Sequence, residues 1–126
     1  NVAVLALAIC DATGQANFEV ETTGLMGQLT ESGSVTVSTA TLDSLIENGR
    51  VEPPDVIKMD IEGAELLALR GASFIFEWYR PVLFLATHGC TVERECRELL
   101  ASWGYQIEEI GETRYDRKEL LAKHRS

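Results

Sequence analysis

The amino-acid sequence predicts an α/β fold in which helices and strands alternate around a largely parallel sheet. From residue 41 onward the patterns read helix, strand, helix, strand, helix, strand, and parallel strands need such crossover helices. The runs 2–9 and 82–87 are short and continuously apolar, which is typical of strands that are buried on both faces. With 126 residues, of which 45% are hydrophobic, the chain is expected to form one domain with a real core.

The first third of the chain is expected to be mostly strand. Residues 2–9 end at a turn formed by residues 11–14. Residues 17–21 and 34–38 alternate apolar and polar side chains, as half-exposed strands do. Between them, residues 22–33 are rich in Gly, Thr and Ser and are predicted to be a loop.

A short helix follows, and then a strand. Thr41 can cap the helix and Gly49 can close it. The inner stripe of the helix consists of Leu42, Leu45 and Ile46. Pro53 and Pro54 forbid helix, so we expect the next strand at residues 56–61.

Helices alternate with strands in the remainder of the chain. A helix over residues 63–70 should stop at Gly71, and a second helical stretch should reach Trp78 before Pro81 ends it. The strand at 82–87 comes next.

The clearest amphipathic helix lies beyond that strand. Its apolar face is formed by Val92, Cys96, Leu99, Leu100 and Trp103. Gly104 ends this helix, residues 105–110 should form a strand, and the tail from Arg114 is expected to be a helical turn or a frayed end.

Charge and cysteine content narrow the possible partners. A net charge of -9 from 20 acidic and 11 basic side chains argues against nucleic acid and against anionic membranes as partners. No apolar run is long enough to span a bilayer. Cys10, Cys90 and Cys96 have no spacing typical of a metal box or a disulfide framework, which favours a reducing cytoplasm.

The most informative stretch is the charged strand at residues 56–61 and the turn after it. Lys58, Asp60 and Glu62 share one parity, and charges on one face of a central strand are costly unless they line a cleft or pair with each other. Ligands of open α/β sheets bind beyond the carboxyl ends of the strands, where Asp60 and Glu62 lie. The alternative is an edge strand with one solvated face, on which Lys58 pairs with a carboxylate.

A resemblance to a known family favours the cleft. The run from Ile57 to Glu65 reads I-K-M-D-I-E-G-A-E, and L-R-G-A at 69–72 and R-P at 80–81 follow it. Together with T-L-D at 41–43, these motifs resemble the signature of the FkbM methyltransferases. The resemblance extends over nearly the whole chain up to about residue 110.

The resemblance implies a Rossmann-like class I methyltransferase sheet within a three-layer sandwich, with strand order 3-2-1-4-5-7-6. Strand three would be residues 2–9 and strand four residues 56–61. Strands one and two, with the glycine-rich loop and the acidic strand end that hold part of the cofactor, are missing from the sequence. We therefore expect residues 1–126 to be the C-terminal part of a single methyltransferase domain in a longer polypeptide. Pairing of residues 2–9 with residues 56–61 would count against this expectation.

The implied activity is transfer of a methyl group from S-adenosylmethionine to a hydroxyl of a small molecule or glycan. Asp60, Glu62 and His88 are the candidate catalytic residues, because carboxylates and imidazole can align an acceptor and take its proton. Ile9, Cys10 and Asp60 are the candidate cofactor-binding residues. The family often has Glu where Ala86 stands here, so no role of that Glu carries over. The fragment alone is expected to be inactive.

Less specific interpretations remain for several of these residues. Glu65 suits the first turn of a helix, His88 could simply end a strand, and Cys10 could be a small buried hydrophobe. A divalent cation on Asp60 and Glu62 is less favoured, because no third acidic ligand is fixed nearby, so no metal is predicted. The alternative function is a non-catalytic α/β scaffold or partner-binding module. A different α/β enzyme is disfavoured, because the sequence contains no phosphate loop or nucleophile elbow.

Overall fold

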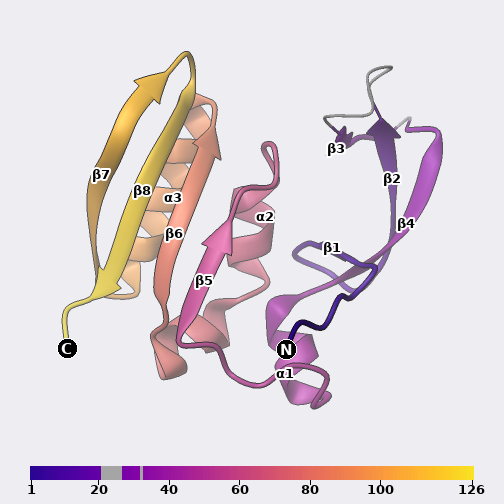
Figure 1. Ribbon diagram of the computed structural model, residues 1–126, viewed down its shortest axis with the longest axis horizontal. Helices are drawn as coiled ribbons and strands as arrows, with labels where there is room; N and C mark the ends of the chain where they lie inside the picture. Colours follow the sequence, from indigo (N-terminus) through magenta and orange to yellow (C-terminus); the bar gives the residue numbers. More distant parts are fainter. Residues whose placement is uncertain (21–26, 32) are drawn as a thin grey trace.

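The computed structural model describes residues 1–20, 27–31 and 33–126, which form a mixed α/β fold with two four-stranded sheets (Figure 1). Along the chain the elements are β1 (Ala8–Ile9), β2 (Gly14–Val20), β3 (Gly27–Leu29), β4 (Val35–Ala40), α1 (Leu42–Glu47), β5 (Val56–Met59), α2 (Glu65–Arg70), the π-helical turn η1 (Ile75–Tyr79), β6 (Val82–His88), α3 (Cys90–Ser102), β7 (Tyr105–Arg114) and β8 (Arg117–His124). The alternation expected from residue 41 onward is confirmed.

The C-terminal sheet has the strand order β5-β6-β8-β7. This order corresponds to strands 4-5-7-6 of the expected arrangement. β5 and β6 are parallel, whereas β8 is antiparallel to both of its neighbours. The expectation of parallel pairing thus holds for β5–β6, but not for the other ladders of this sheet.

The expected helical or frayed tail is wrong, because residues 117–124 form strand β8 between β6 and β7. Leu120 and Ala122 alternate along β8 and are completely buried. Charged residues flank this short apolar alternation, so the local composition resembles that of a solvated tail. Hydrogen bonding to strands on both sides and burial of two side chains outweigh that local preference.

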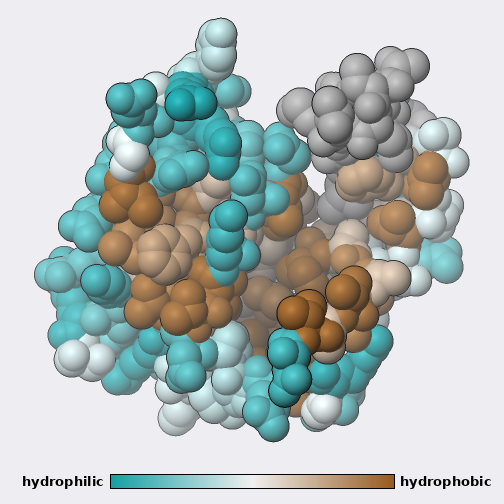
Figure 2. Space-filling view, in the orientation of Figure 1, coloured by the Kyte–Doolittle hydropathy of each residue, from teal (hydrophilic) through white to brown (hydrophobic). Residues whose placement is uncertain are grey.

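Helices α2 and α3 lie on one side of this sheet (Figure 1), and the main core lies between them and the strands. Cys96 and Leu100 of α3 are completely buried, which confirms the apolar face expected from the sequence. Phe76 of η1 stacks on Trp103, with ring centroids 5.5 Å apart. The opposite sheet face bears Phe84, which is 40% exposed, and hydrophobic residues are visible over these strands in Figure 2.

The N-terminal sheet has the order β1-β4-β2-β3. Only the β1–β4 pair is parallel among its described ladders. The long strand expected at residues 2–9 is reduced to Ala8–Ile9, and Val2 and Val4 are 93% and 87% exposed. The reason is that β4 is the only strand among the described residues that pairs with this segment.

The loop expected over residues 22–33 is partly corrected, because Gly27–Leu29 form strand β3 against β2. Residues 22–26 and 32 of this expected loop lie outside the described residues. Ladder hydrogen bonds to β2 make a short strand out of a segment that is rich in turn-forming residues.

Helix α1 joins the two sheets through residues of the T-L-D motif. The Thr41 hydroxyl caps α1 by accepting a hydrogen bond from Ser44 N at 3.0 Å, as predicted. The carboxylate of Asp43 accepts hydrogen bonds from the backbone N–H groups of Phe74 and Ile75, each at 3.0 Å. Asp43 therefore fastens α1 to the start of η1, which explains why an acid suits this position.

Residues 2–9 and 56–61 do not pair with each other: β1 pairs with β4, and β5 pairs with β6. The pairing that would have counted against a longer polypeptide is therefore not formed between the described strands, and the domain assignment stays a prediction. Cys10, Cys90 and Cys96 are free. Among the described residues, no helix is long and apolar enough to cross a membrane.

Candidate functional site

The turn after β5 carries two carboxylates, those of Asp60 and Glu62, that lie near the same histidine. Asp60 follows directly on the end of the strand at Met59. Glu62 and Gly63 then adopt left-handed backbone conformations, with φ of +54° and +101°. A non-glycine residue with positive φ costs on the order of 1 kcal/mol. Such a conformation must be held in place by its surroundings.

Glu65 holds this turn. It lies in the first turn of α2 and is 0% exposed. Its Oε1 atom accepts hydrogen bonds from the N–H groups of Ile61 at 3.3 Å and of Gly63 at 3.1 Å. These two amides bracket the strained residue, so the carboxylate fixes the conformation that directs Glu62.

The same oxygen of Glu65 also orients His88, which ends β6. Nδ1 of His88 lies 2.8 Å from Glu65 Oε1. Sequence reasoning placed Glu65 correctly in a first helical turn but missed this contact. The available signal was an acid at the start of a helix whose next four residues are apolar, because such an acid is buried only when it has partners.

The three residues expected to be catalytic come together. β5 and β6 are parallel neighbours, so their carboxyl ends meet at one edge of the sheet. Nε2 of His88 lies 3.6 Å from Asp60 Oδ1 and 3.4 Å from Glu62 Oε2. The exposed fraction of the side chain is 18% for His88, 31% for Asp60 and 35% for Glu62, so the cluster is reachable from solvent. The catalytic roles of these residues stay predictions.

Arg117 completes the cluster from β8. Its Nη2 atom lies 2.9 Å from Asp60 Oδ2 and 3.2 Å from Glu119 Oε1. No sequence signal identified this residue, because the strand that carries it was not expected. The edge-strand interpretation supposed that Lys58 pairs with a carboxylate. In the structure the partner of Asp60 is Arg117 instead. β5 is at the edge of its sheet among the described strands, but the two carboxylates lie beyond its end and turn toward His88.

A cleft of about 580 Å³ lies beside this cluster, between the two sheets. It is lined by Ala6, Leu7, Ala8, Ile9, Phe18, Val37, Asp60, Ile61, Glu62 and Ala64. Hydrophobic residues gather in this hollow (Figure 2). Of the three expected cofactor-binding residues, Ile9 and Asp60 line the cleft. Cys10 does not, and its thiol donates a hydrogen bond to Asp11 Oδ1 at 3.4 Å.

The residues of the cleft fit the chemistry of S-adenosylmethionine. The apolar wall that contains Ile9 and Phe18 suits a flat apolar group such as adenine, and the volume is in the range of ligand sites. Asp60 and Glu62 place negative charge at one end, where it would complement a sulfonium and an ammonium group.

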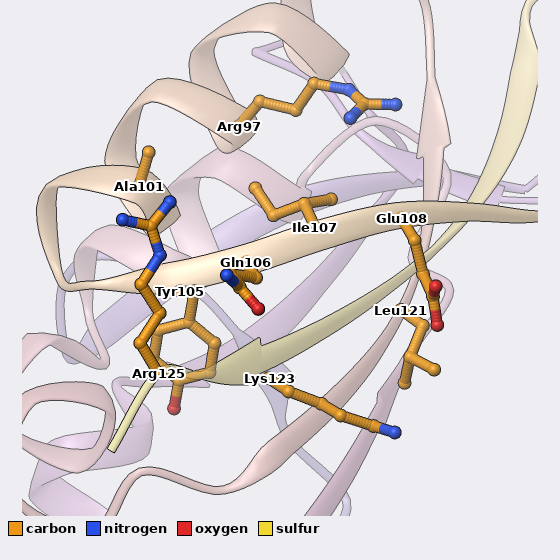
Figure 3. Close-up of a pocket in the computed structure, with 9 residues that line it drawn as sticks. All are labelled: Arg97, Ala101, Tyr105, Gln106, Ile107, Glu108, Leu121, Lys123 and Arg125. Carbon is orange, nitrogen blue, oxygen red and sulfur yellow. The ribbon is translucent and has the colours of Figure 1, made fainter.

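A larger hollow of about 750 Å³ lies at the far edge of the C-terminal sheet, between α3, β7 and β8. Figure 3 shows the guanidinium groups of Arg97 and Arg125 pointing in different directions. Arg97 is engaged by Glu93, whose Oε1 lies 2.8 Å from Nε. The hydroxyl of Tyr105 donates a hydrogen bond to the Pro81 carbonyl at 2.9 Å. With these groups already paired, the chemistry favours the Asp60 cleft as the functional site.

Comparison with known proteins gives consistent matches. Residues 2–112 match the family described as Methyltransferase FkbM domain. Hexuronic acid methyltransferase AglP of Haloferax volcanii is 35% identical over 69 residues, which is 53% of this chain and 29% of that protein. The crystal structure of methyltransferase FkbM from Methylobacillus flagellatus superposes with a TM-score of 0.55 and 28% identity. That match covers 71% of this chain and 24% of the crystallised chain, so the chain spans less than a third of either relative.

Proposed function

Because this chain belongs to the FkbM methyltransferase family, we propose that it forms part of an S-adenosylmethionine-dependent O-methyltransferase. The observation that carries the proposal is the convergence of Asp60, Glu62 and His88 beside an apolar cleft, which Asp60 and Glu62 line. Methyl transfer needs a donor held on an apolar surface beside groups that align an acceptor and take its proton. This arrangement offers both.

The proposed acceptor is a hydroxyl of a small molecule or glycan. The similar protein from Haloferax volcanii carries a name that refers to a hexuronic acid, and this supports a sugar acceptor. Side chains that suit a polyhydroxy compound stand at the mouth of the site. Asp60 and Glu62 are partly exposed acceptors of hydroxyl hydrogen bonds, and the partly exposed Arg117 is a donor.

S-adenosylmethionine, when bound, supplies a methyl group whose bond to a cationic sulfur breaks as a bond to the acceptor oxygen forms, and the product sulfur is a neutral thioether. Ile9 and Asp60 line the cleft that would hold the cofactor. Glu62 and His88 lie where they can take the proton of the acceptor hydroxyl. Glu65 is a positioning residue, because it acts through the ring of His88 and through the turn around Glu62.

Two measurements on the longer polypeptide that contains this chain test this proposal. The first is calorimetric titration of S-adenosylmethionine, and the second is transfer of a labelled methyl group to a panel of uronic acids and neutral sugars. We expect Asp60→Ala and Glu62→Ala to abolish turnover, whereas Glu98→Gln on the exposed surface of α3 should leave it unchanged. Near-normal rates in both site variants would overturn the assigned roles. Absence of cofactor binding would favour the non-catalytic module instead.

A further inference from the structure

Nε2 of His88 has no hydrogen-bond partner among the described residues, although it faces two carboxylates. Its separations from Asp60 Oδ1 and Glu62 Oε2 are 3.6 and 3.4 Å. A charged N–H donor approaches a carboxylate oxygen to about 2.7–2.9 Å. The two carboxylates therefore lie on either side of the nitrogen, but neither is close enough for a charged hydrogen bond.

The other ring nitrogen determines which hydrogen Nε2 can carry. Glu65 Oε1 accepts hydrogen bonds from two backbone N–H groups, so it also acts as an acceptor toward Nδ1 at 2.8 Å. The proton of a neutral ring is then on Nδ1, and Nε2 presents a lone pair. A lone pair that faces two carboxylates is repelled unless a positive charge, which is either a proton on Nε2 or a metal ion, lies between them.

The spacing of the three side chains is slightly wider than that of an occupied cation site, and the partly exposed carboxylates can move inward to close it. Ligand atoms that are each about 2.1 Å from an ion lie about 3.0 Å apart at right angles and about 3.4 Å apart in a tetrahedron. One ligand atom from each of Asp60, Glu62 and His88 can be chosen so that all three lie within 4.8 Å of one another. Carboxylate, histidine and metal in series form the usual support of a metal-binding histidine, and Glu65 is placed to supply that carboxylate.

The local charge also favours a divalent ion. Asp60, Glu62 and Glu65 contribute three negative charges, and Arg117 contributes one positive charge. Arg117 also contacts Glu119 at 3.2 Å, so its charge is shared. Glu65 is completely buried, and its Oε2 has no hydrogen-bond partner. This excess of negative charge favours a cation with more than one positive charge.

We propose that Asp60, Glu62 and His88 bind a divalent cation of the Mn²⁺ type, with Glu65 as the carboxylate behind the histidine. Two carboxylate oxygens and one imidazole nitrogen are a donor set that suits Mn²⁺. Three protein ligands leave open positions, so a sugar hydroxyl can reach the ion and become more acidic. With Nε2 of His88 on the ion, the proton of that hydroxyl goes to the carboxylate oxygen of Glu62 that does not bind the ion, and not to His88. The expectation of no metal rested on the lack of a third acidic ligand. It overlooked that His88 could be the third ligand.

The use of the ion in methyl transfer rests on the proposed function, but binding of the ion does not. The test is therefore calorimetric titration of Mn²⁺ alone into the protein after dialysis against a chelator, without S-adenosylmethionine or acceptor. Mn²⁺ is preferred to Zn²⁺ as the probe, because the thiols of Cys10 and Cys90 bind Mn²⁺ more weakly than they bind Zn²⁺. We expect one site per chain. Glu62→Gln and His88→Ala should weaken binding at least ~10-fold, and Glu65→Gln should weaken it by about 10- to 100-fold.

Glu98→Gln, which removes an exposed carboxylate of α3, is the matched control and should bind Mn²⁺ as the parent does. Circular dichroism checks that each variant is folded, and Glu62→Gln is the least disruptive because its side chain is 35% exposed. Failure of the parent to bind Mn²⁺, or equal affinity in Glu62→Gln and Glu98→Gln, would overturn the proposal. If S-adenosylmethionine still binds in that case, only the metal site is wrong. If Mn²⁺ binds and the longer polypeptide that contains this chain does not bind S-adenosylmethionine, the proposed function is wrong.

Discussion

Glu65 Oε1 lies 2.8 Å from Nδ1 of His88, and the same oxygen accepts hydrogen bonds from two backbone N–H groups of the turn after β5. A single buried atom therefore fixes both the ring of His88 and the left-handed conformation of Glu62. The end of β6 and the turn after β5 are coupled through it. Any substitution of Glu65 should therefore alter both the orientation of the His88 ring and the conformation of the turn after β5.

The first prediction concerns Glu65→Gln. The amide keeps the shape of the side chain and one acceptor oxygen, but it removes the negative charge and puts an NH₂ group in the place of Oε2, which has no hydrogen-bond partner. We expect the free energy of unfolding to fall by about 1–3 kcal/mol, because the hydrogen bonds lose their charged acceptor and the buried NH₂ group has no acceptor of its own. Urea denaturation measures this change, with Glu98→Gln as the control for loss of a surface charge. Equal stability of the two variants would contradict the structural role of Glu65.

The second prediction concerns Gly71, which follows α2. A Cβ atom at this position would clash with the backbone carbonyl oxygen of Cys10 and would lie 3.0 Å from the Cβ atom of Thr41. Gly71 also accepts a hydrogen bond from Asp43 N at 3.0 Å. The glycine of the L-x-G-A motif thus lets the end of α2 pack closely against the residues that follow β1 and precede α1.

Gly71→Ala should therefore lower the free energy of unfolding by about 1–3 kcal/mol, because the added methyl group forces the backbone apart. Ser73→Ala, two residues further along and also partly buried, is the matched control and should change stability by less than about 1 kcal/mol. Thermal denaturation of both variants measures the difference. An unchanged melting temperature in Gly71→Ala would show that the end of α2 does not pack against Cys10 and Thr41 as closely as described.

Local patterns predicted most of the helices and strands because each of these elements buries one continuous face. α3 is the clearest case, since Cys96 and Leu100 recur with helical spacing and are completely buried. β8 was missed because its two buried residues, Leu120 and Ala122, lie among charges. Its stability comes from β6 and β7 on either side, and a single sequence does not show which strands will flank a segment.

The site follows the same division. Asp60 and His88 were expected to meet because parallel neighbouring strands end at the same edge of a sheet. Glu65 and Arg117 were not expected. The burial of Glu65 depends on how α2 packs, and the position of Arg117 depends on the unexpected strand. The sequence thus predicted the site residues at the ends of strands, Asp60 and His88. It did not predict Glu65 and Arg117, which hold them in place, because their positions depend on tertiary packing.

The third prediction concerns the cysteines. Burial raises the pKa of the Cys96 thiol to about 12, and the negative charges of Glu65 and Glu95 add to the effect. Cys90, in contrast, is exposed at the start of α3. At pH 8 a thiol reagent should modify Cys90 within minutes and leave Cys96 unmodified until the protein unfolds, because only the thiolate reacts. Mass spectrometry of the labelled peptides distinguishes the two. Rapid labelling of Cys96 in the folded protein would contradict its place in the core.

The fourth prediction concerns Tyr105 and the alkaline limit of stability. Burial raises the pKa of its phenol from the ordinary value of 10.0 to about 12. The folded state therefore holds the phenol proton more tightly than the unfolded state does. The resulting contribution to stability is fully present below pH 10 and is lost as the pH rises toward 12.

Tyr105→Phe isolates this contribution, because other groups titrate alike in both proteins. At pH 9 the variant should be less stable by about 1 kcal/mol, since the Pro81 carbonyl loses its hydrogen bond. One pH unit above the unfolded-state pKa, the difference should have shifted by about 1.4 kcal/mol in favour of the variant, so the variant should then be the more stable protein. Urea denaturation of both proteins at pH 9 and pH 11 measures the two gaps. A gap that stays constant with pH would mean that the phenol is accessible to solvent and that the pairing of Tyr105 with Pro81 is absent.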